Sequence, residues 1–353
     1  MKLKRRNWSI ANHEFLLDLA AKDLDGRAAF FDWDDTCIFG DCGEAFLYFQ
    51  LSTGVLRLNS AELAALVPTW PQARDQFGLP CNEYQLEKLR DIIQTGAEAL
   101  EAASEKSNPK QPLSALGRGL LALYRLLEKS ASGPGSAYLW AIRLLAGFSP
   151  DEIKESALTC IKRELGLPPA TFFSQAGASG LAGKRRQGIR AFPEMRELVS
   201  LFRSSGIRVY LVSASQPLIV AATAEVTGFE VDGIVGMAGE TNADGLLTGH
   251  LAPGYAINYG DGKVANSNAF IGVEPIFVAG DSVNDLAMMT AYEATRGRLL
   301  LAMKKKPGLE KIYRLARDPK SGTLIQAVNA DRASFSPLVP AWFLDETKKT
   351  NHP

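Results

Sequence analysis

The feature that most constrains the fold is a short apolar run that ends abruptly in carboxylates. Ala28–Phe31 is followed by Asp32, Trp33 and Asp34. Such a run predicts a short buried strand whose carboxyl end opens into a site. On a continuing strand Asp32 and Asp34 would share a face, because side chains alternate. Two carboxylates side by side repel each other unless a cation or a proton separates them, so the pair indicates a magnesium ion.

The carboxylate pair admits two interpretations. In the functional one, Asp32 attacks phosphorus and becomes an aspartyl phosphate. Asp34 then serves as the acid for the leaving alkoxide and the base for the hydrolytic water. In the structural one, an Asp-rich turn simply ends the strand, tied by the hydroxyl of Thr36. This stretch alone does not separate the two, so the rest of the chain has to.

Composition limits the classes of function. The chain has 353 residues and a formal net charge of zero, so no overall field draws it to nucleic acid or acidic lipid. Its four cysteines form no CxxC motif and are expected to be free thiols in the cytoplasm. The basic start Met1–Arg6 is not followed by an apolar run, and no window approaches the roughly 20 apolar residues of a membrane span. We therefore expect a soluble cytoplasmic protein, whose oligomeric state the sequence does not indicate.

Hydrophobic periodicity divides the chain. Helical periodicity dominates from about residue 41 to 187, and from 192 onward helices alternate with strands. The helices expected in the first segment are 43–51, 60–66, 83–103, 113–128, 137–145 and 150–165. The elements expected later are helices at 193–205, 216–228, 263–270, 284–292 and 308–315, and strands at 207–212, 233–237, 275–279 and 298–301, with a hairpin turn at 242–245. Alternating strands and helices predict a parallel sheet covered on both faces.

The expected fold class is therefore α/β, with a Rossmann-like sheet interrupted by a large helical insertion. The expected core spans residues 1–40 and 188–345, the helical cap spans 41–187, and a loose tail spans 346–353. The insertion leaves from the carboxyl end of the first strand, which is where a lid would be mounted. The Gly/Ser-rich basic stretch 174–188 is expected to form a hinge or the edge of that lid.

Two further polar positions lie near the ends of later elements. The strand 207–212 runs into Ser213, whose hydroxyl could bind a phosphate oxygen together with backbone N–H groups, that of Ala214 included. The alternative is a helix cap by Ser213 or Ser215. Lys263 opens a helix and could neutralise both a phosphate and the crowded carboxylates, although most lysines are solvated surface residues.

A third group follows the strand 275–279. Here an apolar strand again ends in carboxylates, Asp281 and Asp285, four residues apart at the start of a helix. Asp281 would supply a magnesium ligand, Asp285 would hold the lysine or the water on the metal, and Asn284 could reach the phosphate. A helix-capping turn explains Asp281 but not the second acid.

The motifs DxDxT, Ser, Lys and GDxxxD occur in this order, and the set resembles that of the haloacid dehalogenase-like hydrolase superfamily. The resemblance covers residues 25–40 and 190–330, and the insertion looks like the helical cap of its first cap type. It implies a Rossmann-like core, Mg²⁺ dependence with Asp32, Asp34, Asp281 and Asp285 at the metal, and an aspartyl phosphate on Asp32. The presence of Asp34 fits the phosphatases of the superfamily rather than its dehalogenases.

The substrate is less constrained. Gly280–Met288 looks similar to the phosphoserine phosphatase branch, whereas the long cap and Ser213-Ala214 are more similar to phosphorylcholine phosphatases. Asp41, Glu44 and Trp140 could contact the part of the substrate beyond the phosphate, because carboxylates and aromatic faces suit an ammonium group. The alternative is that the cap aromatics form its own core. Arginines at 185, 186 and 190 could instead meet a substrate carboxylate, or form a solvated linker.

The leading hypothesis is a Mg²⁺-dependent phosphatase acting on a small, amine-bearing phosphomonoester of the phosphoserine or phosphocholine kind. A phosphotransferase is the second interpretation, and the two would differ in how well the closed site excludes water. A catalytically idle binding protein with the same fold is the third. No member of the motif set is missing, which argues against it. A nucleic-acid substrate is disfavoured by the zero net charge and by the expected cap.

Overall fold

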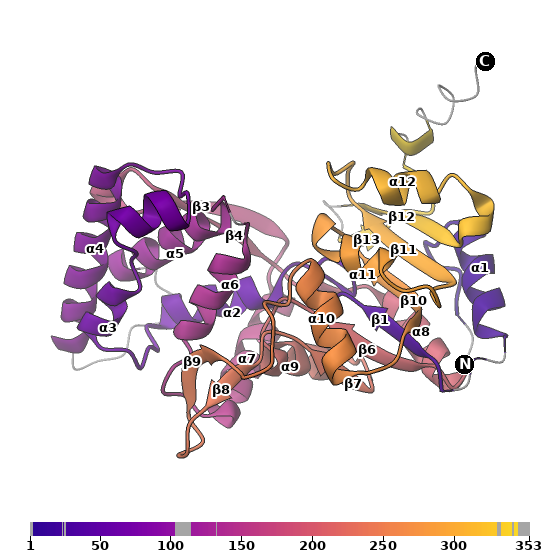
Figure 1. The fold of residues 1–353 in the computed structure, drawn as a ribbon, viewed down its shortest axis with the longest axis horizontal. Coiled ribbons are helices and arrows are strands. Elements are labelled where there is room, and N and C mark those ends of the chain that lie inside the picture. Colours follow the sequence, from indigo (N-terminus) through magenta and orange to yellow (C-terminus); the bar gives the residue numbers. More distant parts are fainter. Residues whose placement is uncertain are drawn as a thin grey trace. The chain divides into compact units, whose positions relative to one another are not determined.

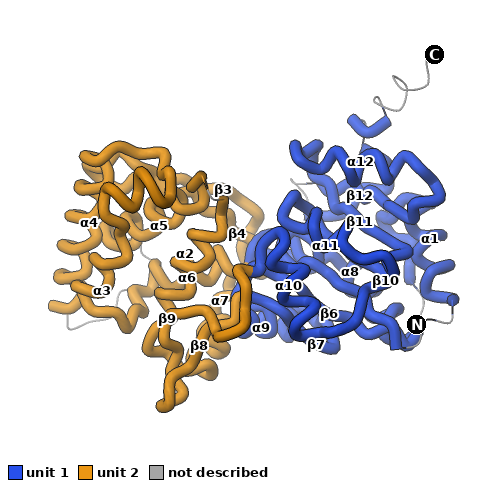
Figure 2. The backbone as a smooth tube through the Cα atoms, viewed as in Figure 1, with its two compact units in different colours: residues 1–41, 189–236, 258–353 blue, residues 42–188, 237–257 orange. Residues whose placement is uncertain are grey.

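The computed structural model describes residues 3–22, 24, 26–102, 114–131, 133–329, 333–340 and 342–344. The chain folds into two compact units, shown in different colours in Figure 2. The first comprises Met1–Asp41, Ile189–Gly236 and Asn258–Pro353, and the second comprises Cys42–Gly188 and Met237–Ile257. The expected tail 346–353 lies outside the described residues.

The first unit is built on a seven-stranded sheet with the order β13-β12-β11-β10-β1-β6-β7 (Figure 1). Its strands are β1 (Ala28–Phe31), β6 (Arg208–Val212), β7 (Gly233–Val235), β10 (Pro275–Gly280), β11 (Gly297–Ala302), β12 (Thr323–Asn329) and β13 (Ser334–Phe335). All neighbours run parallel except β12 and β13. The expected α/β class with a mostly parallel sheet is confirmed.

Helices cover both faces of this sheet. They are α1 (Ile10–Ala20), α8 (Pro193–Ser204), α9 (Pro217–Thr227), α10 (Asp261–Phe270), α11 (Leu286–Thr290) and α12 (Glu310–Leu315), with 3₁₀ turns at Val283–Asp285 and Pro319–Ser321. The fully buried strand β1 shows why both faces need a helical layer. Phe30 packs at 5.8 Å from the ring of Tyr292, which follows α11, whereas Phe31 packs at 6.2 Å from Phe202 of α8. Consecutive strand residues point to opposite faces, so each face receives its own helical layer.

The position of β1 decides where polar side chains gather. β1 lies between β6 and β10, and from it the chain proceeds first to β6 and β7 and later to β10, β11 and β12 on the other side. The carboxyl ends of β1, β6 and β10 therefore meet where the strand order reverses, which is where open α/β sheets bind ligands. A small antiparallel pair, β2 (Ile38–Phe39) with β5 (Arg190–Ala191), completes this unit.

The second unit is mostly helical. Its helices are α2 (Cys42–Thr53), α3 (Ser60–Ala65), α4 (Glu83–Ala102), α5 (Ala115–Glu128), α6 (Gly135–Arg143) and α7 (Pro150–Gly166), with a π-helical turn at Gln72–Gln76 and a 3₁₀ turn at Gly177–Ser179. Its hairpins are β3 (Ala170–Gln175) with β4 (Ala182–Gln187), and β8 (Gly239–Thr241) with β9 (Leu247–Leu251). Buried leucines of α4 and α5 dominate one continuous apolar core.

Two expectations differ from the structure. The stretch 174–188 is not an irregular hinge, because much of it forms β3 and β4, paired from Ala170–Gln187 to Gln175–Ala182. Residues 237–257, placed by the sequence in the core range 188–345, belong to the second unit. The backbone of Leu247 there bonds to Phe148 and Gly147 at 2.8 Å each. A hairpin pattern carries no information about which layer the hairpin joins.

Among the described residues, no helix is both long enough and apolar enough to cross a membrane.

Candidate active site

Asp32 lies directly after β1 and is buried. Its backbone N–H donates to the carbonyl of Ala279 at 2.9 Å, which extends the pairing of β1 with β10 by one residue. The Asp32 carboxylate accepts from the hydroxyl of Thr36 at 2.8 Å through Oδ2 and from Lys263 Nζ at 2.6 Å through Oδ1. Asp32 is thus held by the sheet on one side and by two donors on the other.

Lys263 links two carboxylates. Its ammonium is buried and also donates to Asp285 Oδ1 at 2.7 Å. Burial alone would lower the pKa of Lys263, but the charges of Asp285 and Asp32 raise it above its usual value. Burial raises the pKa of the Asp32 carboxyl well above its usual value, and the negative charge of Asp285 raises it further. A lysine held charged between two acids is fixed in place.

Asp285 organises the end of β10. Its Oδ2 accepts from the backbone N–H groups of Asp281 and Ser282 at 3.1 Å each. Gly280 makes this turn possible, since a Cβ there would lie 2.5 Å from the Cβ of Asp285. The Asp281 carboxylate in turn accepts from Lys306 Nζ at 2.5 Å, and the Asp281 carbonyl accepts from the same ammonium at 3.0 Å.

Asp34 faces a different set of donors. Its Oδ2 accepts from the hydroxyl of Ser215 at 2.7 Å and from that of Ser213 at 3.4 Å. Ser213 Oγ accepts from the backbone N–H of Ser215 at 3.1 Å, while the side chain of Gln216 caps α9. The interpretation of Ser213 or Ser215 as the helix cap is therefore wrong, because Gln216 performs that role.

The loop between Asp34 and β2 is compact. Asp35 adopts a left-handed backbone conformation with φ of 57°, and its Oδ1 accepts from the N–H of Gly40 at 3.0 Å. Asp residues tolerate this conformation better than most because their short side chains bond locally. The loop thereby holds Asp34 beside the two serines.

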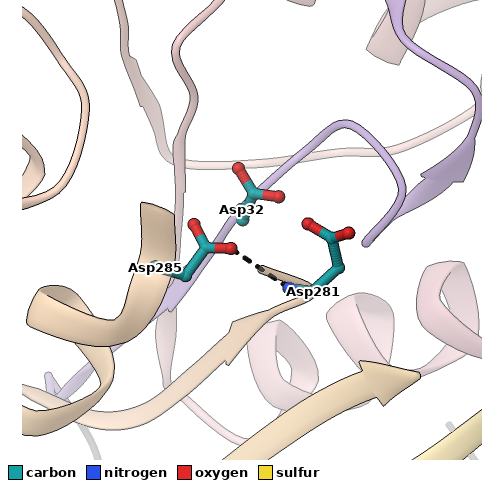
Figure 3. Close-up of side chains that lie close together, drawn as sticks. All are labelled: Asp32, Asp281 and Asp285. Carbon is teal, nitrogen blue, oxygen red and sulfur yellow. Dashed lines mark hydrogen bonds between the residues drawn. The ribbon is translucent and has the colours of Figure 1, made fainter. Parts of the chain in front are cut away.

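Three carboxylates are suited to hold a metal ion. Asp32, Asp281 and Asp285 each offer an oxygen, and these oxygens lie within 4.8 Å of one another (Figure 3). Burial raises the pKa of Asp281 to about 7, with Lys306 opposing the rise and Asp285 adding to it. Crowded, buried carboxylates are stabilised by a cation, and an all-oxygen donor set matches Mg²⁺ or Ca²⁺. The residues therefore fit a hard divalent metal, although the carboxylate of Asp34 is not a member of this group.

Other predicted site residues are distributed between the units. Asn284 and Ala214 are partly exposed at the same edge of the sheet, and the carbonyl of Asn284 accepts from the N–H of Gly260 at 3.1 Å. Asp41 ends the first segment of unit 1 and is half-buried.

The cap residues Glu44 and Trp140 are engaged within the second unit. Both Glu44 carboxylate oxygens accept from Arg125, at 2.7 Å each. Trp140 is only 3% exposed and packs into the apolar core, with its ring 6.2 Å from that of Tyr124. For Trp140 the alternative holds, since it is part of the core of its own unit.

Comparisons with known proteins agree with this geometry. The family model of haloacid dehalogenase-like hydrolases matches residues 113–290, half of the chain. No curated protein matches this chain. The chain belongs to the haloacid dehalogenase-like hydrolase family, as the motif set implies.

Solved structures are similar to this chain to different degrees. A conserved protein of unknown function from Anaerococcus prevotii is 23% identical with a TM-score of 0.79, and the match covers 96% of this chain and 97% of that one. A substrate-bound phosphoserine phosphatase is 14% identical with a TM-score of 0.37, covering 81% and 89%. Cytosolic 5′-nucleotidase IIIB bound to cytidine is 11% identical with a TM-score of 0.42, covering 97% and 93%.

The site also contains residues that the sequence analysis did not assign. Lys306 lies in the connection between β11 and α12, in the run Lys304–Lys306 that reads as a solvated basic turn. Ser215 is expected from the sequence only as a possible helix cap, not as a donor to Asp34. No local signal distinguishes either residue, because both act through contacts with parts of the chain that are distant in sequence.

Proposed function

We propose that this protein hydrolyses small phosphomonoesters through a phosphoryl group transferred to Asp32. The observation that carries the proposal is the arrangement at the end of β1. Asp32 lies 2.6 Å from the buried ammonium of Lys263, with the carboxylates of Asp281 and Asp285 beside it. A carboxylate nucleophile next to a fixed cation and a set of metal-ligating oxygens suits phosphoryl transfer, where positioning and charge neutralisation dominate catalysis.

The chemistry proceeds in two displacements. An oxygen of Asp32 attacks phosphorus, the bond from phosphorus to the ester oxygen breaks, and the leaving alkoxide takes a proton from the Asp34 carboxyl. Asp34, now a carboxylate, takes a proton from water, whose oxygen attacks phosphorus and releases inorganic phosphate and free Asp32. The ammonium of Lys263 holds Asp32 in place and balances charge on the phosphoryl oxygens throughout.

A divalent cation, Mg²⁺ in our proposal, would be held by Asp32, Asp281 and Asp285 and would supply further charge neutralisation at the phosphoryl oxygens. Ser215 and Ser213 hold the Asp34 carboxyl by their hydroxyl groups. Ser213, the N–H of Ala214 and Asn284 remain proposed phosphate contacts. Asp41 remains a proposed contact to the rest of the substrate.

The substrate class is a small phosphate ester, with phosphoserine-like and phosphocholine-like compounds as candidates. Phosphoserine phosphatases occur among the similar structures, and this suggests the first candidate. The aromatic and acidic residues expected to favour an ammonium group are less available than the sequence implies, because Glu44 is paired with Arg125. All four cysteines are free, which is compatible with the predicted cytoplasmic location.

The test is release of inorganic phosphate by the purified full-length chain from a panel of small phosphomonoesters, with Mg²⁺ and with EDTA. Asp32→Asn is run beside the wild type, and Asp18→Asn, which removes an exposed carboxylate from α1, is the matched control. We expect release that needs both the metal and Asp32 and that Asp18→Asn leaves unchanged.

Other outcomes would redirect the proposal. Release by Asp32→Asn at the wild-type rate would overturn the role of Asp32 as nucleophile. Transfer of the phosphoryl group to an added alcohol in place of water would indicate a phosphotransferase. If the folded protein hydrolyses none of the esters, the phosphatase proposal fails and the hypothesis of a catalytically idle binding protein remains.

A further inference from the structure

The hairpin β3–β4 of the second unit presents a polar and aromatic face. Phe172 pairs with Arg185 and Ser174 pairs with Gly183, while Ala170 pairs with Gln187. Residues two apart on a strand, and their direct partners on the next strand, point to the same face. Phe172, Ser174, Arg185 and Gln187 therefore share one side of the hairpin.

That side covers α2 and α5 and leaves a pocket. Gly183 lets the hairpin approach α5 closely, because a Cβ there would lie 2.5 Å from Cγ of Leu121. Beside this contact is a pocket of about 260 Å³. It is lined by Tyr48, Arg118, Phe172, Phe173, Ser174, Arg185 and Gln187, all within the second unit. Its volume is just below the usual range of about 300–1,000 Å³ for such sites and suits a small ligand.

The aromatic lining is unusually accessible. Phe172 is 50% exposed and Phe173 is 75% exposed. Burying an exposed phenyl ring against a flat ligand recovers hydrophobic free energy, and stacked rings attract each other further. The exposed aromatic lining therefore favours a planar, apolar group.

Two buried polar atoms in the lining lack partners. Ser174 Oγ and Arg185 Nε are both buried, and neither has a hydrogen-bond partner among the described residues. Arg185 itself is only 8% exposed. A buried donor without a partner destabilises the fold, so a ligand that accepts from these groups would be favoured.

The charges of the lining have one sign. Arg118 and Arg185 are cationic, and none of the seven lining residues carries a carboxylate. Arg185 is held by Glu164 at 2.5 Å and lies over the ring of Tyr48 at 3.7 Å. The second oxygen of Glu164 accepts from the N–H of Gly188 at 2.8 Å, so Glu164 is occupied in fixing Arg185. The lining therefore offers guanidinium donors and no carboxylate acceptor, which favours an anion over an ammonium group.

We propose that this pocket binds a small aromatic carboxylate. The planar ring would lie against Phe172, and the carboxylate would accept from Arg118 and the hydroxyl of Ser174. Guanidinium groups recognise carboxylates through paired N–H donors, which an amine could not use. This binding site is separate from the proposed phosphatase site, because all of its residues lie in the second unit. Its test measures binding and does not depend on phosphate release.

The experiment is isothermal titration of the full-length chain with 2-naphthoate, and with 2-naphthylmethylamine as a cation carrying the same ring system. Variants are Arg118→Met and Ser174→Ala, and Lys162→Met, which removes an exposed positive charge from α7, is the control. Far-UV circular dichroism verifies that each variant is folded.

We expect 2-naphthoate to bind with one-to-one stoichiometry and the amine to bind at least tenfold more weakly. Arg118→Met is expected to weaken 2-naphthoate binding at least tenfold and Ser174→Ala at least threefold, with Lys162→Met unchanged. Equal binding of the two probes, no binding of 2-naphthoate to the wild type, or unchanged binding by both pocket variants would overturn the proposal. If Arg118→Met does not fold, Ser174→Ala decides.

Discussion

Lys306 Nζ contacts Asp281 twice, through the carboxylate at 2.5 Å and the backbone carbonyl at 3.0 Å. The backbone of Lys306 is fixed by Tyr313, whose hydroxyl accepts from its N–H at 2.9 Å and donates to its carbonyl at 3.1 Å. A tethered ammonium therefore occupies a carboxylate that is also one of the three candidate metal ligands. Lys306 and a divalent cation compete for the same negative charge.

The first prediction concerns metal affinity. Lys306→Met is expected to tighten Mg²⁺ binding about tenfold, equivalent to about 1.4 kcal/mol, because it removes a like charge beside the metal. Binding is measured by titration calorimetry of metal-free protein, independently of turnover. Lys304→Met, which removes an exposed lysine from the same connection, should leave the dissociation constant unchanged. Weaker binding by Lys306→Met would instead show that Lys306 holds Asp281 in its ligating position.

The second prediction concerns the stability of the buried cluster. Lys263→Met leaves Asp32 and Asp285 facing each other without a cation and should lower the free energy of unfolding by about 3–5 kcal/mol. Urea unfolding in EDTA measures this loss. The double variant Lys263→Met/Asp285→Asn carries one buried charge fewer and should recover part of it. A double variant no more stable than Lys263→Met would show that charge is not the cause.

The sequence predicted the parts of the fold that depend on local patterns. The strand Ala28–Phe31 and the helices α2, α4, α7 and α8 lie within one or two residues of their expected ranges. The sequence analysis missed β12 and β13. In β12 the buried residue Gln326 is hydrogen-bonded to Asn12 and Ser336. A buried glutamine interrupts the apolar pattern, and only tertiary contacts explain it.

The same distinction applies to the site. Asp32, Asp281 and Asp285 follow apolar strands, and this signal is local. That Asp32 and Asp285 lie close together follows from the strand order, because adjacent parallel strands bring their carboxyl ends together. Lys263 reaches both carboxylates from α10. Lys306 has no such signal. Its run of three lysines favours solvent, and the contact to Asp281 depends on how Tyr313 fixes the connection.

The third prediction concerns Asp34. Its hydrogen bond from Ser215 is shorter than that from Ser213, 2.7 Å against 3.4 Å. Ser215→Ala should therefore lower kcat about tenfold with little change in KM, a part of the 10²–10⁴-fold that acid–base catalysis contributes. Ser204→Ala, at the end of α8, serves as the control and should retain wild-type kinetics. A larger effect on KM for Ser213→Ala would support phosphate binding by Ser213.

The fourth prediction concerns pH. In the metal-free fold the pKa of Asp281 is raised to about 7, above its usual 3.8, chiefly by burial. Between these values the folded state keeps a proton that the unfolded state releases. This group therefore makes the folded state less stable as pH rises from about 4 to about 7, with no further change above that.

Urea midpoints in EDTA should fall between about pH 4.5 and pH 7 and then level off. Asp281→Asn should fall less steeply, whereas Asp18→Asn should follow the wild type. Saturating Mg²⁺ should reverse the trend in the wild type, because the cation binds the deprotonated carboxylate. An Asp281→Asn variant with the wild-type slope would assign the pH dependence to other groups.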